Sequence, residues 1–433
     1  MTWTWWALCS LLALTGLAGG DSAPAYYAVC DAGSTGTRLY IFLLDTAAGK
    51  AKSVFVKKTK PGLSSYKESP GKAVAPLLAL LKEGAKEVPA EVRATTPLLI
   101  YGTAGMRLLP LRDQSKIWAT LSKDLVSAED FPFDRTSFSG RTVDGDEEGL
   151  WAVLTTNFLT GRMGHDLVSH GLSAPLGLLD LGGSSTQIGI PSPEAAKKGI
   201  NFSSGVLVRS YLGFGMTHIQ KKVRAIMGED LSCFMPDTRT EDGPLKGHNW
   251  GNADICRHHI SEILRQESES CKQTQTEQSC LGDLSGNEDG KKAIKGDVNF
   301  YGVSGLTYVA DFVRWWLASN NLVHALTESF PTPTLEELES AVDVLCKSQY
   351  SGIYELTQDK ATAHKYTDMD NLPYRCFQAN YILVLLGEIY GFDRESRKVT
   401  FALEVEGEDL EWPLGALLHE RATSGATEAA SEL

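Results

Sequence analysis

Short apolar runs alternate with amphipathic segments along the first third of the chain. Strand-like runs cover residues 26–30, 38–44, 52–57 and 97–101, and helical periodicity covers about 71–86 and 112–125. This alternation predicts an α/β domain, and the close succession of the first three runs predicts a strand meander.

A second segment with the same pattern begins near residue 176. The stretch YYAVCDAGSTGTRLYIF at 26–42 and the stretch LGLLDLGGSSTQIGI at 176–190 each lead from an apolar strand through a turn of Gly, Ser and Thr into another apolar strand. Asp31 aligns with Asp180 at the start of the two turns. The copies lie one domain length apart, so the repeat predicts two related domains rather than a solenoid.

The later part of the chain changes character twice. Residues 234–299 are polar and rich in cysteine and glycine, which predicts a loop-rich insertion pinned by disulfides. A strand and a long helix through Trp315 and Trp316 follow. The chain then predicts a helix at 376–390, a last strand, and a closing helix that begins at Pro413.

Composition narrows the function. The chain has 433 residues, 42% of them hydrophobic, which is enough for two or three domains. Its formal net charge is −13, and its lysines and arginines form no long run. A binding surface for nucleic acid is therefore not expected. An acidic protein still binds phosphates where a divalent cation neutralises them.

The first 20 residues are apolar and uncharged and end in small residues, as in a cleaved secretory signal peptide. A retained signal anchor is the alternative, which the short apolar core disfavours. We expect no later membrane span and a disordered tail at 421–433. The signal predicts secretion or residence in the lumen of the endoplasmic reticulum or Golgi. It also makes the NFS sequon at Asn201 a glycosylation site on an exposed loop.

Six cysteines remain beyond the signal segment and Cys30, which ends an apolar strand. An even number in a secretory protein predicts three disulfides and leaves many connectivities open. The six are Cys233, Cys256, Cys271, Cys280, Cys346 and Cys376. A zinc site at Cys256, His258 and His259 is an alternative. A helix that carries a disulfide cysteine is favoured, because no second ligand pair with zinc spacing follows.

The two Gly-rich turns suit a phosphate–metal ligand. The tip of such a turn leaves backbone N–H groups and hydroxyls free to surround phosphate oxygens, and glycine permits close approach. An aspartate at the strand end would repel a bare phosphate, but it can hold the water shell of Ca²⁺ or Mg²⁺. One turn is a weak signal because polar hairpins are common. Its recurrence with Asp31 and Asp180 predicts a clamp around a polyphosphate–metal unit.

Hydrolysis also requires a group that activates water. The segment DGDEEG offers Glu147, for which interaction with the helix dipole is preferred, and Glu148, a candidate general base. The motif YGTAGMRLLP places Thr103 at a strand end, where α/β proteins carry ligand groups, although an ordinary turn explains it equally well. Arg107 is expected to pair with a carboxylate rather than with phosphate.

Five motifs, in order, resemble the signature regions of the ectonucleoside triphosphate diphosphohydrolase (apyrase) family: DAGSTGTR, GTAGMRLL, DGDEEGLWAVLTTNFL, LDLGGSSTQI and FYGVSGLTY. The similarity covers essentially the whole chain after the signal segment. It implies an α/β fold of two actin-like (ribonuclease H-like) domains with a central cleft. We expect 21–147 with 392–420 to form domain I, and 148–391 to form domain II with the Cys-rich insertion at 233–299.

The resemblance also implies roles for single residues. Glu148 matches the family's general base, and Ser185 matches the serine that positions the attacking water. The phosphate-binding set corresponds to Ser34, Thr35, Gly36, Gly182, Gly183 and Ser184, with Thr103 close by. Asp31, Asp180 and Trp412 match groups around a hydrated Ca²⁺ or Mg²⁺. Tyr308 matches a position near the nucleobase, and a packed helical aromatic is its alternative.

Two departures resemble the soluble lumenal members, which prefer nucleoside diphosphates. Gly36 stands where cell-surface members carry histidine, and KPGLSSY at 60–66 is similar to the soluble group. The family's crossed disulfides would pair Cys233 with Cys271, Cys256 with Cys280, and Cys346 with Cys376.

These observations predict a monomeric, metal-dependent nucleoside diphosphatase that acts on UDP and GDP, with ADP and triphosphates as further substrates. The first alternative is a broad apyrase that acts on ATP and ADP. A polyphosphate phosphatase or a sugar kinase of the same fold is disfavoured by the signal segment and by the DEEG helix start, respectively. A secreted nucleotide-binding protein without turnover is disfavoured by the pair Glu148 and Ser185.

Overall fold

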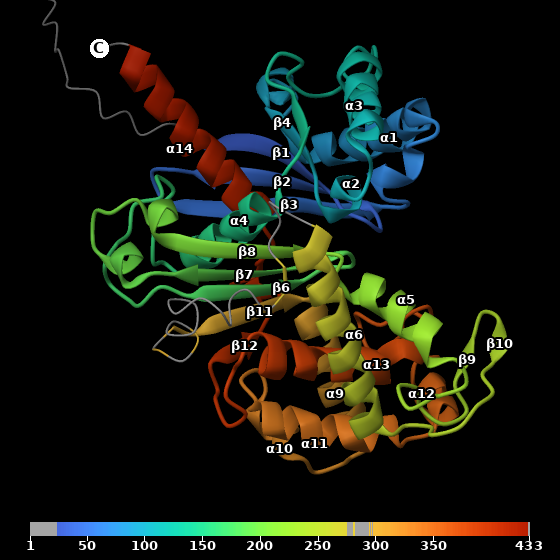
Figure 1. Ribbon diagram of the computed structural model, residues 1–433. Helices are drawn as coiled ribbons and strands as arrows, with labels where there is room; N and C mark the ends of the chain where they lie inside the picture. Colours follow the sequence, from blue (N-terminus) through green and yellow to red (C-terminus); the bar gives the residue numbers. More distant parts are fainter. Residues whose placement is uncertain (1–23, 275–279, 282–293, 295, 297, 432–433) are drawn as a thin grey trace, which may run out of the picture.

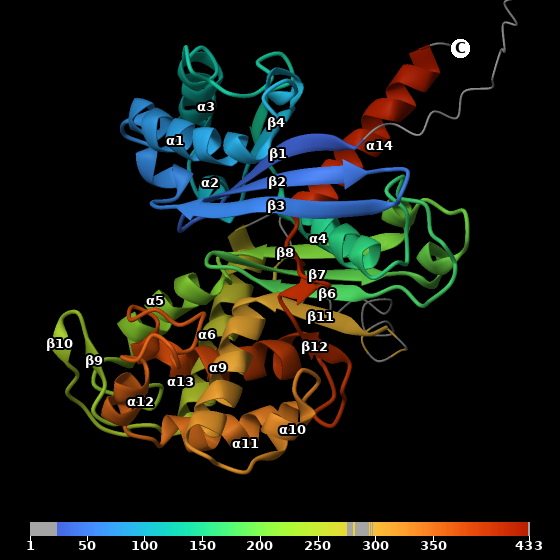
Figure 2. The same cartoon turned by 180° about the vertical axis from the view of Figure 1, so that it is seen from behind.

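The computed structural model describes residues 24–274, 280–281, 294, 296 and 298–431. The expected signal segment, 1–20, and part of the Cys-rich insertion lie outside these residues. The described chain forms two α/β halves, each built on a five-stranded sheet, which lie one above the other in Figure 1 and, from behind, in Figure 2. The predicted α/β fold class is confirmed.

The first sheet contains the predicted meander. Its strands are β1 (Ala25–Ala32), β2 (Thr37–Asp45), β3 (Lys50–Thr59), β4 (Leu98–Gly102) and β5 (Ser139–Thr142), in the spatial order β3-β2-β1-β4-β5. β1, β2 and β3 are antiparallel neighbours, whereas β4 runs parallel to β1 and β5 runs parallel to β4.

The second sheet repeats this topology. Its strands are β6 (Gly177–Leu181), β7 (Ser185–Pro191), β8 (Val206–Leu212), β11 (Phe300–Ser304) and β12 (Val399–Phe401), in the order β8-β7-β6-β11-β12. The first three are again an antiparallel meander, and the last two run parallel to β6. The repeat predicted from Asp31 and Asp180 therefore extends to a whole sheet.

Helices cover the outer face of each sheet. α1 (Val74–Gly84), α2 (Ala104–Arg107) and α3 (Leu111–Thr120) belong to the first half. The second half carries α5 (Met216–Met227), α6 (Ala253–Thr274), α9 (Gly305–Ser319), α10 (Ala325–Ser329), α11 (Leu335–Cys346), α12 (Tyr350–Leu356) and α13 (Arg375–Val384). Successive residues of β1 point into different hydrophobic cores. Cys30 packs with α1 and α3, whereas Val29 packs toward the space between the sheets.

Two helices cross between the sheets and fix the position of the cleft. α4 (Gly145–Leu159) and α14 (Pro413–Ser431) pack against each other, as the crossing in Figure 1 shows. The ring centroids of Trp151 and Trp412 lie 5.6 Å apart. The Thr155 hydroxyl donates to the carbonyl of Glu411 (3.0 Å) and accepts from the N–H of Gly415 (2.8 Å). The start of α14 is thereby held against the middle of α4.

The end of the chain differs from the sequence prediction in two ways. β12 pairs with β11, so residues 399–401 belong to the second sheet and not to the domain I segment expected at 392–420. The chain returns to the first half through the hairpin β13 (Glu404–Val405) and β14 (Glu408–Asp409), which contacts β3. α14 continues to Ser431, past the expected start of a disordered tail at 421, because the segment is rich in alanine, a strong helix former.

Two of the three disulfide pairings implied by the family resemblance are wrong. The structure pairs Cys233 with Cys256 and Cys271 with Cys280. Cys256 lies in the first turn of α6, 4.8 Å from Cys233 between Cα atoms. Cys271 lies about four helical turns, roughly 22 Å, further along the same helix, out of reach of Cys233. The bond between two cysteines also rules out the zinc alternative at Cys256.

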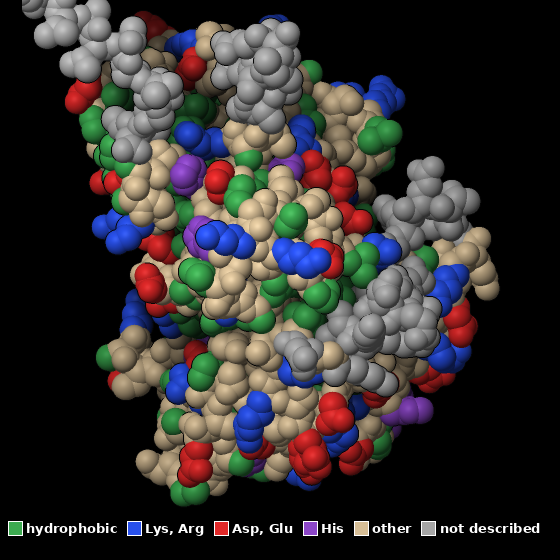
Figure 3. Space-filling view, turned by 90° about the vertical axis from the view of Figure 1, so that its left-hand side faces the viewer, with side chains coloured by type: hydrophobic (Ala, Val, Ile, Leu, Met, Phe, Trp, Pro, Cys, Tyr) green, Lys and Arg blue, Asp and Glu red, His purple; other side chains and the backbone are tan. Residues whose placement is uncertain are grey.

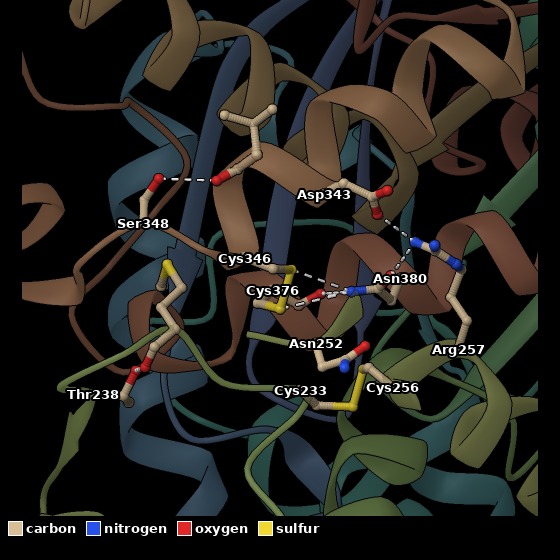
Figure 4. Close-up of a disulfide and its surroundings, with 12 residues drawn as sticks. Cys233, Thr238, Asn252, Cys256, Arg257, Asp343, Cys346, Ser348, Cys376 and Asn380 are labelled. Atoms are coloured by element: carbon tan, nitrogen blue, oxygen red, sulfur yellow. Dashed lines mark hydrogen bonds and ion pairs between the residues drawn. A yellow bond between two sulfur atoms is a disulfide. The ribbon is translucent and has the colours of Figure 1, made fainter. Parts of the chain in front are cut away.

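The third pairing, Cys346 with Cys376, is confirmed and ties α11 to α13. Figure 4 shows that Asn380 points its amide at both sulfur atoms, and that Arg257 of α6 reaches Asn380 and Asp343. The guanidinium lies 2.9 Å from the side-chain oxygen of each. The disulfide and this polar cluster join three helices beneath the second sheet.

The surface carries charges of both signs. On the face drawn in Figure 3, basic and acidic side chains are interspersed and do not gather into one basic patch. None of the helices within the described ranges is long and apolar enough to cross a membrane.

The close packing of α4 against α14 can be tested by adding one methyl group at Gly415. A Cβ atom on Gly415 would lie 1.8 Å from the carbonyl oxygen of Trp151, so Gly415→Ala must push the helices apart. We expect the free energy of unfolding to fall by about 1–3 kcal/mol, the usual cost of overpacking. Chemical denaturation with tryptophan fluorescence would measure it.

Gly352→Ala is the matched control, because a Cβ atom at this helical glycine of α12 meets nothing within 4 Å. Alanine is the better helix former, so the control should be neutral or stabilising by up to about 1 kcal/mol. An unchanged stability for Gly415→Ala would contradict the tight crossing.

Candidate active site

The two Gly-rich turns meet between the halves of the molecule. The first joins β1 to β2 and the second joins β6 to β7. A Cβ atom on Gly183 would lie 3.0 Å from Ser34 Oγ and 3.9 Å from a methyl group of Thr35, so the turns are in contact distance. The sequence repeat therefore places its two copies face to face.

Each turn is supported by the start of a helix. A Cβ atom on Gly105 of α2 would lie 2.6 Å from Ser34 Cα, and one on Gly215, the residue before α5, would lie 2.2 Å from the Ser184 backbone nitrogen. Any side chain at either glycine would displace its turn. The motif at 101–110 thus has a packing function as well as the ligand position that the sequence suggests for Thr103.

The turns enclose a narrow cleft of about 120 Å³. Polar groups from both halves dominate its walls. The predicted residues that line it are Asp31, Ser34, Thr35, Gly36, Thr103, Glu148, Asp180, Gly182, Gly183, Ser184 and Ser185. The structure therefore brings together every predicted catalytic and phosphate-binding position, together with the two predicted metal carboxylates.

Asp31 and Asp180 are the most unusual groups in the cleft. In each, Oδ1 is buried and has no hydrogen-bond partner among the described residues. Burial, and then the nearby charge of Glu411, raises the pKa of Asp31 to about 8. Burial and the charge of Glu148 raise the pKa of Asp180 to about 7. An unpartnered buried carboxylate is costly to a protein unless a cation compensates it.

The residues present fit a hydrated divalent cation. Two carboxylates with free oxygens, beside the hydroxyl of Thr103, are the hard ligands that Ca²⁺ or Mg²⁺ and their water shells prefer. The described residues hold no cluster of three His, Cys, Asp or Glu side chains that could bind a metal directly.

Glu148 is held in one orientation by donors from both halves. Its Oε2 accepts from Arg107 (2.9 Å) and from Gln187 Nε2 (3.1 Å). The same two donors reach Ser185 Oγ, at 3.4 Å and 3.0 Å. Because Ser185 Oγ accepts two hydrogen bonds, its own proton is free to point into the cleft. Burial raises the pKa of Glu148, and Arg107 opposes that rise.

The two glutamates at the start of α4 have different surroundings, as expected. Glu147 closes a capping box with Asp144 and pairs with Arg141 (2.8 Å), so its side chain serves the helix. Glu148 is buried and lines the cleft. The predicted pairing of Arg107 with a carboxylate is confirmed. Gln187 was missed, although Ser185 and Gln187 stand two apart on β7 and must share a face.

Trp412 packs in the core next to the cleft, and its expected place near the water shell of the metal stays a prediction. The residue is 3% exposed, and its ring packs on Trp151 and Tyr101. The residue before it, Glu411, lines the cleft and the pocket beside it and pairs with Arg38 at 2.5 Å. At the bend and turn that precede α14, Glu411 thus faces the cleft and Trp412 faces the core between the sheets.

A second pocket of about 250 Å³ continues from the cleft. Asp31, Thr35, Gly182, Gly183 and Glu411 line both. The predicted Tyr308 lies here, with its ring centroid 5.2 Å from that of Tyr366. Two aromatic faces beside a phosphate-sized cleft can accommodate a planar base.

Tyr366 was missed, because it lies in a loop with no periodic pattern. Arg375 supports it from beneath by donating to the Tyr366 carbonyl (2.9 Å) and to Thr367 Oγ1. His364 packs edge-on against the Tyr366 ring and lies 3.1 Å from Asp311. A buried polar cluster therefore fixes the position of this loop.

Asn201 is exposed, lies at the turn before β8 and does not line the cleft. Its side-chain oxygen accepts from the N–H (3.0 Å) and the hydroxyl (2.7 Å) of Ser203. The exposure agrees with the predicted loop, and glycosylation itself stays a prediction.

Comparison with known proteins gives a consistent result. Residues 21–430 match the model of the GDA1/CD39 (nucleoside phosphatase) family. The chain is 25% identical to the nucleoside-triphosphatase ntp-1 of Caenorhabditis elegans, over 91% of this chain and 73% of that protein. It is 22% identical to the nucleoside-diphosphatase mig-23 of the same species (92% and 77%). It is 26% identical to probable apyrase 1 of Oryza sativa subsp. japonica (95% and 85%).

Solved structures support the fold. A nucleoside triphosphate hydrolase structure from Neospora caninum superposes with a TM-score of 0.57 at 16% identity and covers 93% of each chain. The PPX-GPPA enzyme of Aquifex aeolicus gives a TM-score of 0.50 at 12% identity, over 92% of this chain and 100% of that one. At these identities the likeness concerns the fold alone, and it agrees with the predicted actin-like arrangement.

Replacing Asp31 or Asp180 by asparagine should change how the stability of the protein depends on pH and on calcium. The pKa values of Asp31 and Asp180 in the folded protein, about 8 and about 7, lie above the ordinary value of 3.8. The folded state therefore binds more protons than the unfolded chain, and these groups lower stability as pH rises from about 4 to about 8. In EDTA, Asp31→Asn and Asp180→Asn should raise the melting temperature more at alkaline than at acid pH.

Calcium should raise the melting temperature of the wild-type protein and have little effect on either variant. Asp124→Asn, at an exposed position on the first half, is the control that should behave like wild type. A calcium effect that persists in both cleft variants would mean that the metal binds elsewhere.

Proposed function

The chain belongs to the GDA1/CD39 (nucleoside phosphatase) family, whose model matches residues 21–430, and we propose that it hydrolyses nucleoside diphosphates. The products are a nucleoside monophosphate and phosphate. UDP and GDP are the preferred substrates in this proposal, and ADP and triphosphates are further ones.

The observation that carries the proposal is the opposition of the two turns around unpartnered carboxylates. Asp31 and Asp180 each leave one buried oxygen without a partner among the described residues, in a cleft lined by Gly, Ser and Thr residues of both turns. The backbone N–H groups and hydroxyls of such turns can donate to phosphate oxygens. A phosphate chain brings negative charge that such donors attract and that the carboxylates repel. The attraction outweighs the repulsion only when a cation lies between the carboxylates and the phosphate. This arrangement favours a nucleotide with Ca²⁺ or Mg²⁺ over a free phosphate ester.

When bound, the cation would neutralise phosphate charge and favour the developing charge of the transition state. Asp31 and Asp180 would hold its water shell, with Thr103 beside them. The remaining chemistry belongs to the chain's own residues.

Glu148 is the proposed general base. Arg107 and Gln187 occupy its Oε2, so Oε1 is left to accept a proton from water on the cleft side. Ser185 directs its hydroxyl proton to the same region and orients that water. The backbone N–H groups of the turns around Ser34 and Gly183 bind the phosphoryl oxygens as their charge redistributes. No covalent enzyme intermediate is required.

The proposed preference for diphosphates rests on one residue of the first turn and on one segment after β3. Gly36 and the KPGLSSY segment resemble soluble members of the apyrase family rather than cell-surface ones. The curated relatives carry both nucleoside-triphosphatase and nucleoside-diphosphatase in their names, so they support the chemistry without deciding chain length. A broad apyrase is the second candidate, favoured by the likeness to probable apyrase 1.

We also propose that the protein acts in the secretory pathway or outside the cell as a monomer. Three disulfides within the described chain support an oxidising compartment. The pocket with Tyr308 and Tyr366 is proposed to hold the nucleobase.

Glu148→Gln should leave folding and nucleotide binding intact and lower kcat at least about 100-fold, because the amide cannot accept the proton. Steady-state phosphate release and calorimetric binding would measure the two effects. Glu147→Gln is the matched control, since this neighbour caps the helix outside the cleft. Near-normal turnover in Glu148→Gln would refute its assignment as the base.

Phosphate release should follow the order UDP and GDP, then ADP, then ATP, when each is measured as kcat/KM on the mature protein with Ca²⁺ or Mg²⁺. ATP and ADP used as efficiently as UDP would favour the broad apyrase. Binding of nucleotide without release from any of the four would mean a non-catalytic binding protein.

A further inference from the structure

Lys58 is a cation in the cleft that the proposed mechanism does not use. It lies on β3 directly opposite Arg38 of β2, so the two side chains share one face of the sheet, and both line the cleft. Two like charges opposite each other on adjacent strands destabilise a sheet. Their presence at the wall of a cleft points to an anion that compensates them.

Arg38 and Lys58 differ in their ion pairs with the rest of the described chain. Arg38 pairs with Glu411 at 2.5 Å. Lys58 forms no ion pair with any residue that the structure describes. Its Nζ donates one hydrogen bond, to Thr35 Oγ1 at 3.0 Å. An ammonium group has three N–H donors, so two remain for a ligand at the tip of the first turn.

Because Gly36 has no side chain, it leaves space for the side chain of Lys58. A Cβ atom on Gly36 would lie 2.5 Å from Lys58 Cε, 3.2 Å from Lys58 Cγ and 2.6 Å from the carbonyl oxygen of Thr59. The stem of Lys58 therefore crosses over Gly36 in the space that a larger residue would fill. The absent side chain is what allows an ammonium group to reach the turn from the neighbouring strand.

The position of Lys58 along the cleft indicates which phosphate it meets. Thr35, its hydrogen-bond partner, lines both the cleft and the pocket that holds Tyr308 and Tyr366. Lys58 itself, like Glu148 and Ser185, lines the cleft but not that pocket. Its two neighbours, Thr35 and the opposite strand residue Arg38, line both, whereas Arg107 and Gln187, the partners of Glu148 and Ser185, do not line the pocket. These neighbours place the Lys58 ammonium group at the part of the cleft that adjoins the pocket.

We propose that Lys58 binds the phosphate that stays with the nucleoside, and that it sets affinity for nucleoside diphosphate and monophosphate without acting in the chemical step. This inference rests on the proposed function. Such a contact is equally strong in the ground state and the transition state, so its loss raises KM and leaves kcat unchanged.

Lys58→Met, which keeps the stem and removes the charge, tests the proposal. With UDP as substrate we expect KM and the inhibition constant of UMP each to rise about tenfold, and kcat to change by less than about twofold. The inhibition constant of inorganic phosphate, which occupies the position of the transferred group, should stay within about twofold. Lys57→Met is the matched control, because Lys57 faces away from the cleft and pairs with Glu83 at 2.6 Å.

Two outcomes would overturn the proposal. Unchanged affinity for UMP in Lys58→Met would mean that the ammonium group touches no phosphate. A fall in kcat together with weaker inhibition by inorganic phosphate would place Lys58 at the transferred group instead. Calorimetric binding of UMP with Ca²⁺ reports on Lys58 even if the wild-type protein releases no phosphate from UDP, so failure of the proposed function would be seen separately.

Discussion

The rest of the structure depends on two buried carboxylates, each of which has one oxygen without a hydrogen-bond partner among the described residues. Asp31 and Asp180 end equivalent strands, and burial raises the pKa of both. A protein without a ligand loses stability by holding them there. Two sheets of identical topology keep the strand ends opposed, the α4–α14 crossing holds the sheets together, and Gly105 and Gly215 let helix starts press against each turn. In the proposed function, the nucleotide–metal complex supplies the charge that compensates these carboxylates.

The two halves repeat the same sheet but contribute different chemistry. The first half supplies Arg107 and the cationic wall of Arg38 and Lys58, and the second supplies Ser185 and Gln187. Glu148 lies on the helix between the sheets and receives one donor from each side. The proposed base is therefore oriented only when both halves are in place. The two tyrosines of the adjoining pocket come from the second half, whereas Asp31, Thr35 and Arg38 of the first half line its other side.

Local patterns predicted much of this fold, and pairings over long distances did not. The meander, the repeat and the place of Glu147 at a helix start depend on residues close in sequence, so periodicity and turn composition were sufficient. The two partners of Glu148 come from two elements, α2 and β7, and no local pattern joins Arg107 to Gln187. Glu411 and Trp412 lie at the turn before α14, and which of them faces the cleft depends on how that turn packs. The disulfides of the insertion depend on the length of α6, which keeps Cys256 and Cys271 apart. Tyr366 reaches its position only through the buried cluster around Arg375 and His364.

The most direct test of the account is a crystal structure of the Glu148→Gln variant with UDP and Ca²⁺. The account predicts the ion between Asp31 and Asp180, bound through water, the terminal phosphate between the turns at 33–37 and 182–185, and the uracil beside Tyr308 and Tyr366. A nucleotide bound outside this cleft, or an ion that avoids both aspartates, would contradict it.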